Sequence, residues 1–385
     1  MLNAIGMKEY NQRKILNKLR VNSLSRAELA RQTGLTRAAI GVLADHLIEK
    51  EIIVEGKEIV GQKGRKSVEL QLNSKRYYAI GISIERTGYA IGVIDFTGKV
   101  KEVRDISEDD YQYDIETILK NIYRMILEMR NIYDSQGELL GIGITSPGPL
   151  DISKGTILNP PNFHKWSTLK IVDYFQDKLK CPVYLENDLN GLALAEKYFG
   201  VGNQYNNYIV FSIDHGLGSG TIINGEIYVG SSGFGSNFGH ITVDMNGKIC
   251  DCGNRGCIEL YASLPNILSY ARQMNEEFIK WEIIIDKMIE GDKSAKEIVE
   301  KECEYLSIIF TTAMNIMDVD GIILSGKLCY KGEKIRQILE EKVNTFFIGR
   351  KEKYVPIVMS TLTENANILS SGNIVLEHFF KNVKL

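Results

Sequence analysis

The feature that most constrains this chain is a dense group of metal-ligand side chains between residues 240 and 259. Cys250, Cys252 and Cys257 are three of the chain's six cysteines. They fall within eight residues of one another, and His240 lies ten residues upstream. Three thiolates and one imidazole complete the tetrahedral shell that zinc prefers. A chance cluster of thiols or a disulfide is the alternative, but the other cysteines are scattered. The spacing therefore predicts a zinc site.

Length and composition indicate a globular protein of two or three domains. The chain has 385 residues, of which 44% are hydrophobic and 25% are charged, and this is enough to bury a substantial core. No apolar run approaches the length of a membrane span, and the N-terminus has no apolar segment followed by a cleavage site. We therefore expect no membrane partner and a cytoplasmic location.

Charge is distributed unevenly along the chain. Residues 1–76 contain 15 Lys and Arg and 8 Asp and Glu, a net charge of +7. This leaves 31 basic and 41 acidic residues, a net charge of −10, in the remainder. A basic head on an acidic body suggests that only the head approaches a polyanion. A solvated, mildly basic surface would give the same numbers.

Three short helical patterns occur within the first fifty residues. The first covers about residues 8–21. The second begins at Ser25, where Ser25-Arg-Ala-Glu28 has the form of a capping box, and it stops at Gly34. The third begins at Thr36, a favourable N-cap residue, and carries apolar side chains at helical spacing. Two helices joined by a turn that contains glycine form a helix-turn-helix pattern.

The third helix has the features of a recognition helix. Its outward side chains would face base edges in the major groove, and Arg37 could reach a guanine or a phosphate. Two alternating strands follow, and the basic segment between them, residues 61–66, predicts the wing of a winged helix-turn-helix. A small helical domain that docks onto protein is the alternative for the helices alone. The DNA-contacting candidates are Ser25, Arg26, Thr36, Arg37, Ala38, Gly41, Lys63, Arg65 and Lys66.

The cysteine segment also resembles the signature of the ROK family, which contains sugar kinases and sugar-responsive transcriptional repressors. The resemblance rests on Gly239-His-Ile-Thr-Val-Asp244, on the cysteine cluster, and on Glu259 with Leu-Tyr-Ala-Ser after it. It implies that the zinc is structural and holds the loop carrying His240 and Glu259, which bind the sugar. The head is similar to that of ROK repressors, whereas ROK kinases lack such a domain.

The resemblance implies an α/β fold in which an N-terminal winged helix-turn-helix precedes a two-lobed actin/hexokinase-like domain. Two strand-turn-strand units about 130 residues apart, which begin at Tyr78 and Tyr208, favour the same duplicated architecture. We expect a winged helix-turn-helix DNA-binding head over residues 1–76 and a ROK sugar-binding domain over residues 77–385. Lobe one of this domain should cover about residues 77–195 together with the C-terminal helix 365–385. Lobe two should cover about residues 196–364 and contain the zinc site.

In the kinases of this family, both turns clasp the phosphates of ATP through backbone N–H groups, which requires small residues. The second turn, residues 216–220, is rich in glycine. In the first turn Ser83 replaces the family's Asp, and Glu85 and Arg86 replace two glycines. The Glu85 carboxylate would repel phosphate. We therefore expect that ATP binding and phosphoryl transfer have been lost, so that the chain is not an enzyme.

Residues 186–190, Glu-Asn-Asp-Leu-Asn, match the family's sugar and catalytic motif. The resemblance implies that Asn187 bonds sugar hydroxyls and that Asp188, the base in the kinases, is vestigial. A plain helix cap is the alternative. Asn237 replaces the family's usual Glu, so we expect an effector that differs from the common sugars, binds weakly or is phosphorylated. The expected sugar-binding residues are Asn187, Asp188, Asn237, His240 and Glu259.

These observations together predict a sugar-responsive, DNA-binding transcriptional regulator, similar in layout to the xylose repressors of the ROK family. We expect the head to bind operator DNA as a homodimer or homotetramer and the cleft to bind a small-molecule sugar effector. Repression rather than activation rests on the resemblance. Two alternatives stay open: a working sugar kinase with a DNA-binding head, which Asp188 favours, and a DNA-binding protein that has lost its ligand, which Asn237 indicates.

Overall fold

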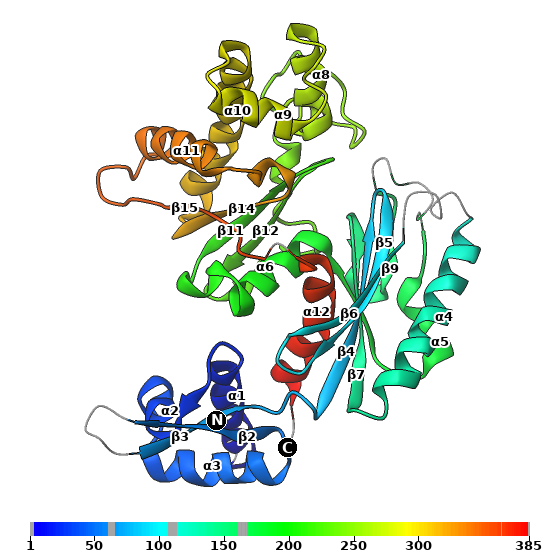
Figure 1. Cartoon of the computed structure of the whole chain (residues 1–385), viewed down its shortest axis with the longest axis vertical. Helices are drawn as coiled ribbons and strands as arrows, with labels where there is room; N and C mark the ends of the chain where they lie inside the picture. Colours follow the sequence, from blue (N-terminus) through cyan, green and yellow to red (C-terminus); the bar gives the residue numbers. More distant parts are fainter. Residues whose placement is uncertain are drawn as a thin grey trace.

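The chain is organised as a small head followed by two α/β lobes (Figure 1). The structure is a computed structural model, and it describes residues 4–60, 66–106, 114–160, 163, 166, 168–362 and 364–383. Each lobe is built on a five-stranded sheet, and the last helix of the chain returns to lobe one and ends beside the head. This is the predicted fold class. Among the helices within the described ranges, none is both long enough and apolar enough to cross a membrane.

The head combines three helices with a three-stranded sheet of order β1-β3-β2, in which neighbouring strands are antiparallel. The helices bury their apolar faces around Leu16, Ile40 and Leu47, as the helical spacing predicts. The elements of the head are α1 (Ala4–Leu19), β1 (Leu24–Ser25), α2 (Arg26–Thr33), α3 (Arg37–Glu49), β2 (Ile53–Val60) and β3 (Lys66–Leu72).

Caps fix the two helices of the helix-turn-helix. The Ser25 hydroxyl accepts a hydrogen bond from the Glu28 backbone N–H, and the Glu28 carboxylate accepts one from the Ser25 backbone N–H, which is the predicted capping box. Gly34, with φ of 72°, ends α2 in the left-handed conformation. The Thr36 hydroxyl then accepts from the Ala39 N–H and starts α3.

Lobe one is built on a sheet of order β10-β7-β4-β5-β6. β7 runs parallel to both β4 and β10, whereas β5 is antiparallel to β4 and β6. Side chains alternate along β4: Ile80 and Ile82 face α4 and α5, while Ala79 and Gly81 face α12. The elements of this lobe are β4 (Tyr77–Glu85), β5 (Gly88–Asp95), β6 (Val100–Ile106), α4 (Ile115–Tyr133), β7 (Glu138–Ser146), α5 (Ile171–Leu179), β10 (Val183–Asn187) and α12 (Ala366–Asn382).

Lobe two repeats this plan on a sheet of order β13-β12-β11-β14-β15. The β11–β12 hairpin with parallel β14 corresponds to the β4–β5 hairpin with parallel β7. α6 covers one face through Ala193 and Leu194, and helices that include α8, α9, α10 and α11 cover the other (Figure 1). The elements are α6 (Asp188–Phe199), β11 (Tyr208–Ile213), β12 (Leu217–Ile223), β13 (Glu226–Ile227), α8 (Leu264–Met274), α9 (Trp281–Ile289), α10 (Lys293–Met317), β14 (Gly321–Ser325), α11 (Glu333–Phe346) and β15 (Ile357–Met359).

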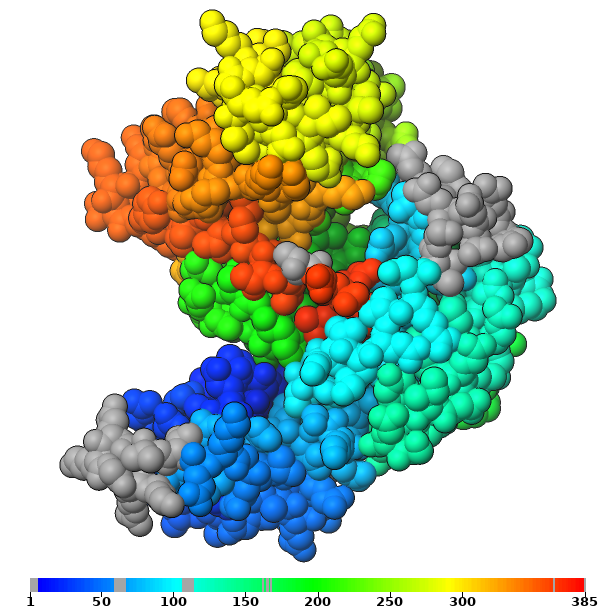
Figure 2. All heavy atoms as spheres, in the orientation of Figure 1, coloured from blue at the N-terminus to red at the C-terminus, as the bar shows by residue number. Residues whose placement is uncertain are grey.

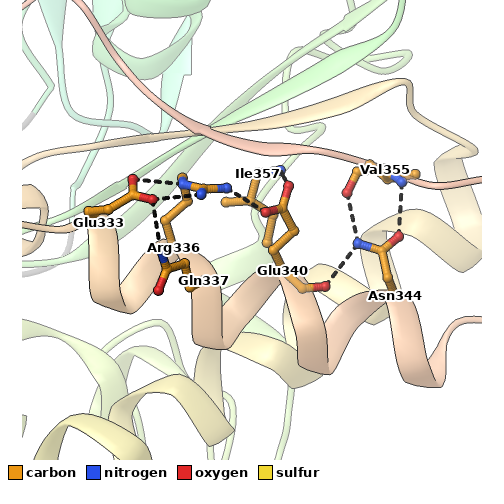
Figure 3. A network of polar contacts seen from close by, with 7 residues as sticks. All are labelled: Glu333, Arg336, Gln337, Glu340, Asn344, Val355 and Ile357. Atoms are coloured by element: carbon orange, nitrogen blue, oxygen red, sulfur yellow. Dashed lines mark hydrogen bonds and ion pairs between the residues drawn. The ribbon is translucent and has the colours of Figure 1, made fainter.

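A polar network fastens α11 to the strand that follows it (Figure 3). The Asn344 side chain donates to the Val355 carbonyl and accepts from the Val355 N–H, both at 2.9 Å. The Glu340 carboxylate accepts from the Ile357 N–H at 3.1 Å and also pairs with Arg336. These bonds satisfy the N–H and C=O groups of Val355 and the N–H group of Ile357, so they fix the position of α11 along β15.

α12 approaches the sheet of lobe one through very small residues. A Cβ atom at Gly143 would lie 1.9 Å from the Ser371 carbonyl oxygen, and one at Gly81 would lie 2.4 Å from the Ser371 hydroxyl. Neither glycine can therefore gain a side chain while α12 stays in place. The core on this side of the sheet is continuous with the core of the head, because Leu16 and Leu376 belong to the same buried cluster.

Candidate functional site

A cavity of about 330 Å³ lies between the two lobes, and the space-filling view shows an opening at this boundary (Figure 2). The carboxyl ends of parallel strands meet there. Ser83 of β4 pairs with Thr145 of β7, Ser146 of β7 pairs with Asn187 of β10, and Ser212 of β11 and Ser325 of β14 line the opposite wall. Parallel α/β sheets bind ligands at this edge, so the fold itself selects the cavity as the ligand site.

The junction between β10 of lobe one and α6 contributes Asn187 and Asp188. The Asn187 side-chain oxygen accepts from the N–H groups of Leu189 and Asn190, at 3.0 and 3.2 Å. Asn187 is therefore a helix cap, as one interpretation of the sequence held, but its amide nitrogen stays available to a ligand because the cap uses only the oxygen. Burial raises the pKa of Asp188 to about 6, although a hydrogen bond from the Leu189 N–H and the charge of Arg86 lower it.

Lobe two contributes the other three predicted residues to the same cavity. Glu259 begins the short helix α7 (Glu259–Ala262), and its carboxylate accepts from the Leu217 N–H at 2.9 Å. Asn237 donates its amide to the Phe234 carbonyl at 2.9 Å, which leaves its oxygen as an acceptor. His240 closes a 3-10 turn, η5 (Phe238–His240). All five predicted sugar-binding residues therefore line one cavity.

The predicted metal ligands also come together. One ligand atom from each of His240, Cys250, Cys252 and Cys257 lies within 4.8 Å of all the others. His240 Nδ1 is 3.7 Å from Cys250 Sγ, and Cys252 Sγ is 3.7 Å from Cys257 Sγ. Zn–S bonds of about 2.3 Å in a tetrahedron separate two sulfurs by about 3.8 Å. The residues present therefore fit a tetrahedral zinc ion.

Glycines and a neighbouring amide shape the loop around this cluster. Gly256 has a φ of 67°, and a Cβ there would lie 1.8 Å from the Asp244 carbonyl oxygen, so only glycine allows the turn. Asn254 donates its amide to the His240 carbonyl at 3.1 Å. Burial and the neighbouring thiols raise the pKa of Cys257 to about 12. A bound cation reverses this shift, because it favours the thiolate.

The turn between β4 and β5 is occupied by side chains. The Glu85 carboxylate accepts from the Ser83 hydroxyl at 3.2 Å and from the Asn367 amide at 2.9 Å. The half-buried Arg86 side chain crosses the cleft, and its guanidinium lies 3.5 Å from the position of a Cβ at Gly216 in the turn of lobe two. Glu85, Arg86 and Gly216 all line the cavity. This wall is polar and charged, unlike a bare backbone cradle for phosphate.

Asn367 and Arg86 were not among the predicted site residues. Their roles depend on the return of α12 to lobe one and on the position of the two turns across the cleft. The one signal in the sequence was the pair of charged residues in a turn where the family has glycine.

The predicted DNA-contacting residues of the head fall into a group that is exposed on α3 and a group whose side chains already have partners within the head. Arg37, Ala38 and Val42 are exposed on α3, and Gly41 has open space around it; Thr36 caps the same helix. By contrast, the side chain of Ser25 is enclosed and used in its cap, and Arg26 pairs with Asp45 at 2.9 Å and with Glu55 at 3.0 Å. Ser25 and Arg26 stay predicted DNA contacts, with the Ser25 side chain in its cap and the Arg26 guanidinium in exposed ion pairs. Lys63 and Arg65, and the side chain of Lys66, lie outside the described part of the chain.

Comparison with known proteins places this architecture in a family. The sequence profile described as "ROK family" matches residues 79–377. The chain is 30% identical over 383 residues to the xylose repressor of Bacillus spizizenii, covering 98% of each sequence. It is 28% identical to a glucokinase of Thermotoga maritima, covering 77% of this chain and 97% of that one. The chain therefore belongs to the ROK family.

A solved structure supports the fold over nearly the whole length. A ROK family transcriptional regulator, described as a homolog of the E. coli MLC protein, has a TM-score of 0.80 with this chain and covers 97% of both. The sequence identity is 24%. The likeness therefore establishes that the head and both lobes share the architecture of that regulator.

The cysteine cluster predicts a measurable metal content. Chain purified with zinc and then passed through a chelator column should retain about one zinc ion per chain, and Cys257→Ser should retain almost none, because three ligands hold the ion much more weakly than four. Cys181→Ser, at a half-buried cysteine of lobe one outside the cluster, is the matched control and should keep its zinc. Equal zinc in all three proteins would contradict the assignment of the four ligands.

Proposed function

We propose that this protein is a sugar-responsive transcriptional repressor, in which the head binds operator DNA and the cleft between the lobes binds the effector. The observation that carries the proposal is the presence, in one chain, of a helix-turn-helix with an exposed α3 and of a cleft that has sugar-binding residues but a blocked phosphate turn. The similarity to xylose repressors over 98% of the chain supports repression as the direction of control.

The head has the properties that DNA recognition requires. Its net charge of +7 favours a polyanion, and the exposed face of α3 offers both polar and apolar readout. Arg37 can donate to guanine or phosphate, and Val42, with 71% of its surface exposed, can contact a thymine methyl group. Helix-turn-helix proteins bind palindromic sites as symmetric assemblies. We propose a homodimer or homotetramer on operator DNA.

The cleft has the properties that sugar recognition requires. Sugar hydroxyls both donate and accept hydrogen bonds, and the cavity offers the Asn187 amide, the Asp188 and Glu259 carboxylates, and His240. His240 turns Nδ1 toward the cysteines, which leaves Nε2 for a ligand. The Asn237 amide oxygen is a weaker acceptor than a carboxylate. We propose a monosaccharide effector whose contact at Asn237 differs from that of the common family sugars.

In this proposal zinc has a structural role. The ion would be held by His240, Cys250, Cys252 and Cys257, and it would supply the cross-link that a short loop without a core of its own lacks. The ion would also fix two residues of the sugar site, because His240 is itself a metal ligand and Glu259 lies two residues after the ligand Cys257. The loop residues Asn254 and Gly256 then orient these groups.

A sugar kinase is the second candidate. A buried aspartate with a pKa of about 6, such as Asp188, suits a general base, and relatives with the same fold include kinases. Against it stand Glu85 and Arg86, which occupy the turn where ATP phosphates need backbone N–H groups. Ser83 also stands against it, because its hydroxyl lacks the negative charge that a carboxylate offers to magnesium. We propose that phosphoryl transfer is absent.

A thermal-shift screen of the zinc-loaded chain separates the candidates. The panel contains D-xylose, D-glucose, N-acetyl-D-glucosamine, their phosphates, and ATP with magnesium. A sugar at about 100 times its dissociation constant should raise the melting temperature by about 5 °C, and ATP with magnesium should leave it unchanged. A shift with ATP, together with ADP release that Asp188→Asn abolishes, would replace the repressor by the kinase.

Sugar affinity should depend on pH through Asp188. Because its pKa is raised to about 6, the carboxyl takes up a proton as the pH falls through 6 and then accepts hydrogen bonds poorly. Affinity for the sugar identified in the screen should be constant above about pH 7 and about tenfold lower at pH 5. Titration calorimetry measures this change. Asp188→Asn should bind more weakly and lose the pH dependence. A retained zinc content at pH 5 is the control, and an unchanged pH profile in the variant would contradict the role of Asp188.

A further inference from the structure

One end of α6 lies at the cavity between the lobes, and the other end lies beside the head. Its N-terminus carries Asn187 and Asp188 in the cavity, and its last turn carries Tyr198 beside the head. The helix has 12 residues and is about 18 Å long at 1.5 Å per residue. A shift of its first turn therefore reaches its last turn without any intervening loop.

α6 packs on lobe two. The Tyr208 hydroxyl of β11 donates to the Ala193 carbonyl at 2.8 Å, and a Cβ at Gly220 of β12 would lie 2.1 Å from the Leu189 carbonyl oxygen. α12, by contrast, packs on lobe one through Gly81 and Gly143. α6 also contacts lobe one, because a Cβ at Gly191 would lie 2.8 Å from Thr145 Cγ2 of β7. A rotation of the lobes therefore has to shift α6 against one of the two surfaces that hold it.

Arg20, which follows α1 in the head, contacts both helices. Its guanidinium donates to the Glu377 carboxylate at 2.7 Å and to the Asn373 side-chain oxygen at 2.9 Å, both on α12. The same guanidinium lies 3.4 Å from the ring centroid of Tyr198 on α6 and 4.6 Å from that of Phe380 on α12. Its side chain is 2% exposed. Arg20 is therefore held between one helix of each lobe.

Three cations lie near the buried Glu377 carboxylate. Burial alone would raise the pKa of Glu377, but the charges of Arg20, Lys197 and Lys381 hold it at about 2. Lys381 also pairs at 2.8 Å with Glu226 of β13, in lobe two. That outer pair is solvent-exposed and contributes little. The buried pair of Arg20 and Glu377 is the one that fixes the head.

The docked arrangement leaves some polar groups unsatisfied. Within the described part of the chain, Arg20 Nε, Asn373 Nδ2 and Gln12 Nε2 are buried without a hydrogen-bond partner. Buried donors without partners cost free energy.

We propose that Arg20 transmits the state of the cleft to the head, because it bonds α12 of lobe one and stacks on Tyr198 of α6 in lobe two. A change in the angle between the lobes cannot preserve both contacts, so the head must shift with one lobe or the other. The proposal rests on the proposed function, and it identifies the route by which sugar changes DNA affinity.

The test uses Tyr198→Leu, which removes the ring that stacks on Arg20 and the hydroxyl that interacts with Glu377, and keeps both partners of the buried ion pair. The matched control is Tyr174→Leu, at a half-buried tyrosine of α5 in lobe one. The DNA probe is a duplex selected from a random pool by the wild-type chain, and the sugar is the member of the screening panel that stabilises it. For each protein, anisotropy gives the DNA dissociation constant with and without that sugar, and calorimetry gives the sugar affinity.

Tyr198→Leu should keep the wild-type affinities for sugar alone and for DNA alone within about threefold, while the sugar-induced change in DNA affinity falls at least fivefold. Tyr174→Leu should keep the wild-type response. An unchanged response in Tyr198→Leu would overturn the proposal. If the wild-type chain binds no duplex or no panel sugar, the proposed function has failed instead.

A second measurement needs neither ligand. The double variant Arg20→Met with Glu377→Leu removes both partners of the buried pair, while Lys197 and Lys381 keep Glu226 as a partner. It should accelerate amide hydrogen exchange in α1 relative to wild type and to Tyr174→Leu, because the head is then less tightly docked. Exchange in α1 that stays at the wild-type rate in this variant would overturn the role of Arg20.

Discussion

The packing of α12 against lobe one is the contact on which the other parts of the molecule depend. Ser371 and Gly372 face Gly81 and Gly143 at distances that no larger residue allows, so the last helix of the chain covers one face of the first sheet of lobe one. The same helix supplies Asn367 to the cleft and Glu377 to the head. One helix thus brings together the ligand site and the DNA-binding unit.

Two buried carboxylates near the ends of this assembly behave in opposite ways for a simple electrostatic reason. Asp188 has one arginine nearby, and burial raises its pKa to about 6. Glu377 is surrounded by three cations, which hold its pKa at about 2 despite burial. The Asp188 carboxyl can therefore gain or lose a proton near neutral pH, and it suits hydrogen bonding to the hydroxyl groups of a ligand. The Glu377 carboxylate is permanently charged and suits a fixed joint.

The sequence predicted features that are set by local chemistry. The four metal ligands, the capping box at Ser25 and the exposed face of α3 follow from spacing within a few residues, and the alternation along β4 follows from strand geometry. Contacts between distant segments could not be predicted in this way. Arg26 is a DNA candidate from the sequence, but its ion pairs with Asp45 and Glu55 depend on the fold and could not be predicted. Arg20 gave no signal, because Glu377 lies 357 residues away.

In the proposed function, one chain couples sugar in the cleft to DNA at the head without a nucleotide. This coupling is measured as the dissociation constant of the zinc-loaded chain for its selected duplex, with and without a saturating sugar, in buffer free of ATP. We predict at least a tenfold change, and linkage requires DNA to change the sugar affinity by the same factor. Equal DNA affinity with and without a sugar that is shown to bind would contradict it.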